Sequence, residues 1–193
     1  MRRPFVFVVF LFVGAAASVA APFAFAQPTP MPAKALWIDV PYVQQPSDGC
    51  GAASLSMVMQ YWAQQQGHSA SPASNVETIQ HQLYDPSAHG ILASSMQSYL
   101  RDHGYLAFAI DGRWSDLETQ LQKGRPLIVA LRPQGQRELH YVVVDGIDPT
   151  RGLVTMNDPA LRKLLSQERA SFEKDWSATN HWMLLAVPSP SSH

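Results

Sequence analysis

The sequence predicts an α+β domain in which an N-terminal helix packs against a largely antiparallel sheet. Apolar side chains follow one helical face over residues 51–62. After residue 125 the apolar segments instead alternate or run continuously, as they do in strands. Two of these later segments flank the turn-forming stretch 148–152, which predicts a hairpin. A helix-rich first half followed by paired strands is the pattern of an α+β fold.

The first 26 residues have the three parts of a secretory signal peptide. Arg2 and Arg3 supply positive charge, residues 5–13 are apolar, and residues 24–26 form a small-residue cleavage site before Gln27. The alternative is an uncleaved N-terminal anchor, although the apolar run is short for a membrane span. We therefore expect an exported protein that is periplasmic or extracellular.

Cleavage of this segment would leave 167 of the 193 residues, enough for one domain with a sizeable core. We place that domain at residues 35–187, between a flexible lead-in at 27–34 and a disordered tail at 188–193. The formal charge changes from −1 to −3, because two arginines and no acidic residues are removed. That charge argues against a nucleic-acid partner, and no later segment is apolar enough to span a membrane.

Helices dominate the first half of the expected domain. The segment between residues 64 and 90 is mostly polar, yet Val76, Ile79 and Leu83 have the spacing of one helical face. Gly104 is suited to end a helix over residues 91–103. We expect, in order, a strand at 37–43, a helix at 51–62, a short helix around 76–83 and a helix at 91–103.

Strands dominate the second half. Residues 127–131 are continuously apolar, as in a strand buried on both faces. Ser115 and Glu118 predict a capping box at the start of a helix that ends at Gly124. The expected elements are a strand at 105–110, a helix at 115–124, strands at 127–131, 141–144 and 153–156, a short helix at 161–165 and a last strand at 181–187.

The single cysteine, Cys50, lies immediately before the first helix. Unpaired backbone N–H groups and the helix dipole at that position favour the thiolate over the thiol. Cysteines of exported proteins usually form pairs, so an unpaired one is either buried and inert or retained for its reactivity. Its position predicts a nucleophile.

Among seven histidines, His140 is the candidate base. It begins the first strand of the predicted hairpin, where a side chain can be held rigidly facing the first helix. A neutral imidazole can accept a thiol proton, and an imidazolium can later donate it to a leaving amine. The other histidines lie in polar segments, at ends of elements or in the tail, where surface and capping roles are usual.

Hairpin register selects a carboxylate to orient His140. A turn centred near Thr150 places Val142 opposite Asp158. Asp158 then lies diagonal to His140 on the same face of the sheet, within reach of the imidazole. Asn157 is the alternative, because a slip of one residue would exchange the faces of these two neighbours.

Four segments between residues 39 and 187 resemble motifs of the bacteriocin-processing, or double-glycine, cysteine peptidases, family thirty-nine of the cysteine peptidases. The segments occur in the family's order. They are Gln44 with the turn at 48–51 and the following helix, residues 140–146, residues 157–159, and Phe172 with Trp176.

The resemblance implies a papain-like fold and a thiol peptidase, which the signal segment would make an exported one. In that activity Cys50 attacks the carbonyl, His140 moves the proton and Asp158 orients His140. Gln44, six residues before the cysteine, matches the family's oxyanion-hole glutamine, whose amide can bind negative charge on the carbonyl oxygen. Gln45 is the competing choice on spacing alone.

The implied partner is a peptide or protein substrate. Gly49 and Gly51, which have no side chains, would let the substrate backbone approach the thiol. No cofactor or metal is expected, because the histidines lack paired ligand spacing and one cysteine cannot supply a zinc cluster. Three other functions fit the same sequence: an acyltransferase or amidase with the same residues, a silent peptide-binding module, or a structural domain with a buried cysteine.

Overall fold

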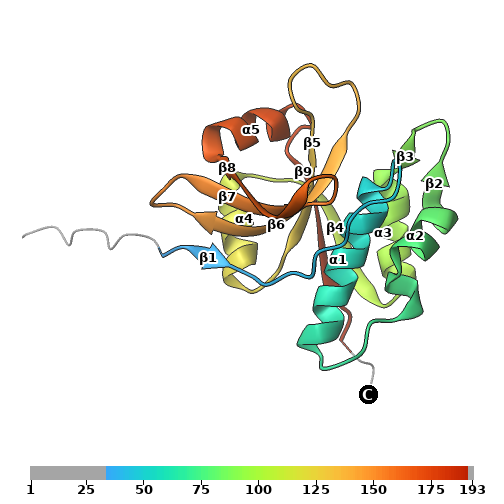
Figure 1. The fold of residues 1–193 in the computed structure, drawn as a ribbon. Coiled ribbons are helices and arrows are strands. Elements are labelled where there is room, and N and C mark those ends of the chain that lie inside the picture. The colour runs from blue at the N-terminus through green and yellow to red at the C-terminus, as the bar shows by residue number, and fades with distance from the viewer. Residues whose placement is uncertain (1–33, 191–193) are drawn as a thin grey trace, which may run out of the picture. The chain divides into compact units, whose positions relative to one another are not determined.

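The computed structural model describes residues 34–190, in which a group of helices packs against a sheet (Figure 1). The expected signal peptide at 1–26, and the lead-in up to residue 33, lie outside the described residues. None of the helices within the described range is both long and apolar enough to cross a membrane.

Three helices form the group that carries the candidate nucleophile. Helix α1 contacts α2, α3 and the strands of the sheet, while the other two helices, α4 and α5, pack on the sheet itself (Figure 1). The helices are α1 (Cys50–Gln65), α2 (Val76–Leu83), α3 (Ala93–Asp102), α4 (Trp114–Gln122) and α5 (Arg169–Ser177), with one 3-10 turn at Pro72–Ser74.

Seven strands of the described region form one antiparallel sheet in the order β4-β9-β5-β6-β7-β8, and β1 pairs with the far end of β6. A separate two-stranded hairpin, β2 with β3, lies beside the helices. The strands are β1 (Leu36–Trp37), β2 (Tyr84–Asp85), β3 (Gly90–Ile91), β4 (Tyr105–Asp111), β5 (Leu127–Leu131), β6 (His140–Asp148), β7 (Leu153–Asp158), β8 (Arg162–Glu168) and β9 (Trp182–Pro188).

Helix α1 is buried on nearly all sides over its first three turns. Its residues 51–59 are all buried, since α2 and α3 cover the side that faces away from β5, β6 and β9. Even Ser56 is inside, where its hydroxyl donates to the backbone oxygen of Ser74 at 2.6 Å. Full burial holds the N-terminal end of the helix, and therefore Cys50, in one position.

The pairing of β6 with β7 contains a one-residue irregularity at Asp145. Near the turn Gly146 pairs with Thr155, whereas beyond the irregularity Val144 pairs with Met156. Asp145 is therefore an extra residue on β6, a β-bulge. The bulge produces the register that the sequence predicts beside the site, because a hairpin without it would shift β7 by one residue there.

Residue 161 lies in a turn and residues 162–165 begin strand β8, so the helix expected at 161–165 is wrong. Leu161 and Leu164 are exposed, with only Leu165 packed against the core, which is not the pattern of a buried helical face. The side-chain oxygen of Asn157 accepts a hydrogen bond from the Leu164 backbone N–H at 3.0 Å. Pairing with β7 thus outweighs the helical spacing of the leucines.

Smaller differences from the expected elements occur elsewhere. Helix α4 begins at Trp114, one residue earlier than expected, because Asp116 accepts from the backbone N–H of Arg113 (2.8 Å) in place of the expected Ser115–Glu118 capping box. Strand β1 covers only the first residue of the expected 37–43 strand and extends to Leu36. The β2–β3 hairpin within the polar segment was not expected. The ordered chain also extends into the expected tail, where Ser189 N–H donates to the Gly104 oxygen at 2.9 Å.

The side chain of Asp145 is fully buried, and neither of its oxygens has a hydrogen-bond partner among the described residues. Burial raises the pKa of Asp145 to about 7, although its own backbone N–H and nearby Lys163 oppose that shift. The folded protein therefore binds a proton that the unfolded chain has already lost, and stability falls as pH rises from about 4 to about 7.

We predict that Asp145→Asn stabilises the protein by about 2 to 4 kcal/mol at pH 8 and by much less near pH 4, because the amide carries no charge to bury. Urea denaturation at both pH values measures the difference. Asp111→Asn, at an exposed carboxyl on β4, is the matched control. An equal effect of Asp145→Asn at the two pH values would contradict the prediction.

Candidate active site

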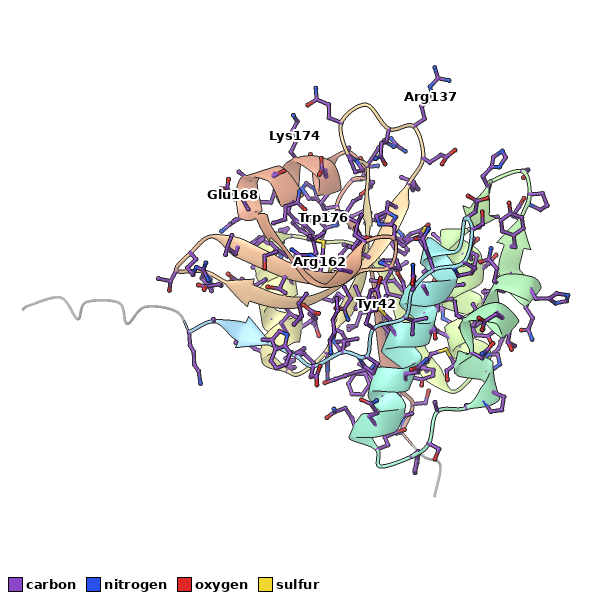
Figure 2. All side chains as sticks on the ribbon, in the orientation of Figure 1. Tyr42, Arg137, Arg162, Glu168, Lys174 and Trp176 are labelled. Atoms are coloured by element: carbon purple, nitrogen blue, oxygen red, sulfur yellow. The ribbon has the colours of Figure 1, made fainter. Side chains whose placement is uncertain are left out.

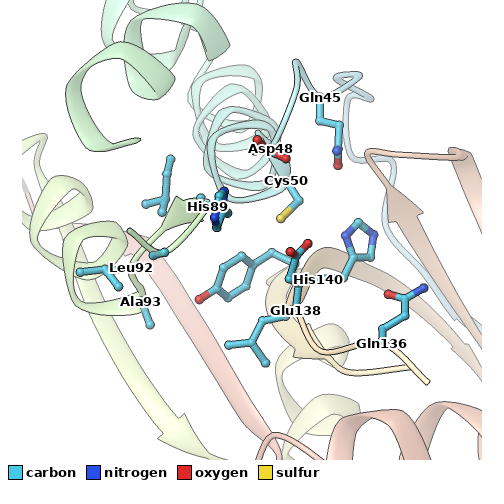
Figure 3. Close-up of a pocket in the computed structure, with 14 residues that line it drawn as sticks. Gln45, Asp48, Cys50, His89, Leu92, Ala93, Gln136, Glu138 and His140 are labelled. Atoms are coloured by element: carbon cyan, nitrogen blue, oxygen red, sulfur yellow. The ribbon is translucent and has the colours of Figure 1, made fainter. Parts of the chain in front are cut away.

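Cys50 is the first residue of α1 and is partly exposed at the helix end that faces the sheet (Figure 3). The flanking glycines are buried and have a packing role. A Cβ atom at Gly49 would lie 2.6 Å from the Pro46 ring, and one at Gly51 would lie 3.1 Å from Ile91. The role expected of these glycines in admitting a substrate backbone stays a prediction.

His140 and Asp158 meet on one face of the sheet, as the register argument predicts. The Nε2 atom of His140 lies 2.8 Å from Oδ1 of Asp158, and that oxygen also accepts from the Ala160 backbone N–H at 2.9 Å. Cys50 lies beside the imidazole, where the two side chains interact electrostatically (Figure 3). Because Nε2 is used by Asp158, Nδ1 is the ring atom left to face the thiol (Figure 3).

The charges of this trio favour a protonated imidazole. Burial alone would lower the pKa of His140, but hydrogen bonds with Asp158 and Cys50, and the negative charge of both groups, raise it to about 9. Burial would raise the pKa of Asp158, yet its bonds with His140 and two backbone N–H groups lower it. At neutral pH the arrangement therefore holds an imidazolium between two acidic groups.

A cavity of about 420 Å³ opens over Cys50 and His140 (Figure 3). Residues 88–93, from the β2–β3 hairpin to the start of α3, form one wall. Residues 136, 138 and 139, which precede β6, and Tyr141 form the other. The sequence gives no periodic signal for either wall, although the polar segment 64–90 does contain the hairpin.

Gln45 lines this cavity and Gln44 does not. Gln44 is exposed, whereas the Gln45 side chain points toward Cys50 and His140 (Figure 3). The oxygen of the Gln45 amide is buried without a partner among the described residues. The structure thus places beside the thiol not Gln44, the residue expected from the six-residue spacing, but its neighbour Gln45, because the chain from Gln44 to Cys50 turns at Pro46 and Asp48 is left-handed (φ 53°).

Within residues 34–190, no three His, Cys, Asp or Glu side chains are grouped closely enough to hold a metal ion. The donor atoms of the site are committed to one another, since Asp158 and Cys50 both interact with His140. What the arrangement offers chemically is a thiol, an imidazole that can take or give a proton, and an amide beside them.

Comparison with known proteins finds a match to the Peptidase_C39 like family over residues 37–182. No curated protein matches the chain. Several solved structures are similar to it, among them three C39 proteins. A C39-like protein from Bacillus anthracis is 15% identical with a TM-score of 0.64, and the match covers 82% of this chain and 100% of that one.

The other two are peptidase domains of transporters. A double-glycine-motif protease of an AMS/PCAT transporter, solved with a leader peptide, is 22% identical with a TM-score of 0.60, covering 79% of this chain and 94% of its own. The peptidase domain of Streptococcus ComA is 20% identical with a TM-score of 0.58, covering 77% and 98%. These likenesses confirm the predicted α+β, papain-like fold.

We predict that Cys50 of the folded protein is alkylated by iodoacetamide at about pH 6 much faster than the same cysteine in urea. His140→Ala should slow this reaction roughly 100-fold, because an unassisted thiol, with an ordinary pKa of about 8.5, is almost wholly protonated at that pH. The advantage over the unfolded chain should disappear as pH rises through about 9, where His140 loses its proton.

Asp158→Asn should move this upper limit to lower pH, since it removes a negative charge that raises the pKa of His140. His81→Ala, on α2, is the control and should leave the profile unchanged. A pH profile indifferent to both His140 and Asp158 would show that the cysteine is not activated by them.

Proposed function

The chain belongs to the Peptidase_C39 like family, and from that premise we propose that it is a cysteine peptidase that uses Cys50, His140 and Asp158. The observation that supports this most directly is the position of His140, whose Nε2 bonds Asp158 while its ring lies beside Cys50 in the cavity (Figure 3). Peptide binding alone requires no such proton relay.

In the proposed reaction the Cys50 sulfur attacks the carbonyl carbon of a peptide bond. A C–S bond forms, and the electron pair of the C=O π bond moves onto oxygen. The amide of Gln45 and the backbone N–H of Cys50 stabilise this oxyanion. Protonated His140 donates to the leaving amine as the C–N bond breaks, which leaves an acyl-enzyme.

Water completes the cycle. His140, now neutral, takes a proton from a water molecule that attacks the thioester, and the thiolate leaves as the imidazolium is restored. Asp158 holds the imidazole in place and favours its charged form throughout. Because an amine could attack the thioester in place of water, the same site supports acyl transfer as the alternative reaction.

The proposed substrate is a peptide or protein. The AMS/PCAT protease was solved with its leader peptide, and its similar fold supports an extended peptide lying in the cleft between residues 88–93 and 136–141. Incubating the protein with a peptide mixture and reading the products by mass spectrometry tests this, with Cys50→Ala as the blank. New hydrolysis products absent from the blank support a peptidase, and products joined to added glycinamide indicate acyl transfer.

We predict that Gln45→Ala lowers kcat for a cleaved peptide by about 100- to 1,000-fold, the usual cost of one oxyanion donor. Gln44→Ala is the matched control, because it makes the same change at the preceding residue, whose side chain is exposed. Steady-state kinetics of both variants decides between them. A loss confined to Gln44→Ala would restore the spacing-based assignment.

We further propose that the protein is exported after removal of residues 1–26. The charged start, the apolar run and the Ala24-Phe25-Ala26 site support this. N-terminal sequencing of the protein recovered from an expressing bacterium should then begin at Gln27. A chain that retains Met1 and stays with the membrane would indicate an uncleaved anchor instead.

A further inference from the structure

Asn157 is a fully buried polar residue that no step of the proposed reaction uses. Its side-chain nitrogen donates to the backbone oxygen of Val40 at 3.0 Å, and its oxygen accepts from the Leu164 N–H at 3.0 Å. Both hydrogen-bonding ends of the amide are therefore satisfied by backbone atoms, from segments far apart in the sequence. Such a bridge fixes the relative positions of the two backbone segments that it joins.

One of those segments carries Gln45. Residues 38–45 form no helix or strand in the structure, so their path depends on the individual contacts that hold them. The backbone N–H of Gln45 donates to the Pro159 oxygen at 3.0 Å, and the hydroxyl of Tyr42 donates to the same oxygen at 3.3 Å. Tyr42 lies on this segment where it passes between α1 and the sheet (Figure 2).

Three of the contacts that hold this segment come from residues 157–159, at the end of β7 and the start of the turn after it. Two more hold its first residues, where Ile38 N–H donates to the Asp145 oxygen at 2.8 Å and Lys163 pairs with Asp39 at 2.7 Å. Successive residues of a strand point to opposite faces. Asp158 consequently faces His140 (2.8 Å), while Asn157 faces the segment at Val40. This three-residue stretch thus contacts the imidazole through Asp158 and the glutamine segment through Asn157 and Pro159.

We propose that Asn157 is a positioning residue, whose bond to Val40 holds segment 38–45 so that the Gln45 amide lies where an oxyanion forms beside Cys50. This inference rests on the proposed role of Gln45, and it adds a residue that never touches substrate. Losing the bond would let the segment shift and would misplace the amide, while the Asp158–His140 contact on the other face would persist. A displacement of about 1 Å at such a donor is enough to cost up to about 100-fold.

A peptide aldehyde tests this without turnover. N-acetyl-glycyl-glycinal, which has no side chains, reacts with the thiol to form a thiohemiacetal. The sulfur bonds to the carbonyl carbon, the π electrons move onto oxygen, and the thiol proton passes to His140 or to that oxygen. Its Kd follows from protection of Cys50 against iodoacetamide. Alkylation itself displaces iodide and builds no oxyanion, so its uninhibited rate reports on Cys50 and His140 alone.

We predict that Asn157→Ala weakens aldehyde binding about 10- to 100-fold and leaves the uninhibited alkylation rate at pH 6 unchanged. The same substitution in a Gln45→Ala background should weaken binding little further, because the group through which Asn157 acts is already absent. Gln44→Ala is the control and should bind as the wild-type protein does.

Asn157→Asp keeps the oxygen that accepts from Leu164 but, when ionised, has no donor for Val40. Because aspartate has nearly the shape of asparagine, this variant serves if the alanine variant fails to fold. It should show the same selective loss. The proposal would be overturned if a folded Asn157 variant bound the aldehyde with wild-type affinity, or if its loss of affinity added fully to that of Gln45→Ala. A slowed alkylation rate in the variant, or no protection of the wild-type protein by the aldehyde, would overturn it as well. A wild-type protein that binds the aldehyde yet cleaves no peptide would instead count against the peptidase activity alone.

Discussion

The register between β6 and β7 is the constraint on which the site depends. His140 begins β6 and Asp158 ends β7, so their side chains meet only if the two strands pair with the correct offset. The bulge at Asp145 sets that offset, since pairing near the turn is shifted by one residue relative to pairing near the site. Without the extra residue, Asp158 would face away from the imidazole and Asn157 would take its place.

The bulge leaves the Asp145 carboxyl buried, with no hydrogen-bond partner for either oxygen in the part of the chain that the structure describes. Asp145 lies where the bulge directs it into the interior, and its cost in stability rises as it ionises. The turn at 157–159 then uses the register that the bulge provides. Asp158 reaches His140 on one side of the turn, and Asn157 and Pro159 hold the chain that carries Gln45. The same short stretch of backbone thereby positions both the acid–base group, His140, and the proposed oxyanion donor, Gln45.

Sequence reasoning succeeded where local pattern and strand geometry were sufficient. The helix behind Cys50, the strand at 127–131 and the 141–156 hairpin follow from periodicity and turn residues, and their burial in the structure agrees. It failed at 161–165, where leucine spacing suggested a helix but pairing with β7 and the Asn157 amide impose a strand. Gln44 was preferred over Gln45 on its six-residue spacing from Cys50, and spacing does not show how the loop turns Gln45 into the cavity.

By itself, the sequence determined the class of fold, the candidate nucleophile and histidine, and the face of the hairpin from which a carboxylate could reach that histidine. These depend on the period of a helix or strand and on chemistry that belongs to a residue type. Only the tertiary structure decided which glutamine enters the cleft, that the flanking glycines serve packing, and that 88–93 and 136–139 wall the site. Those outcomes depend on contacts between segments distant in the chain, which no local pattern encodes.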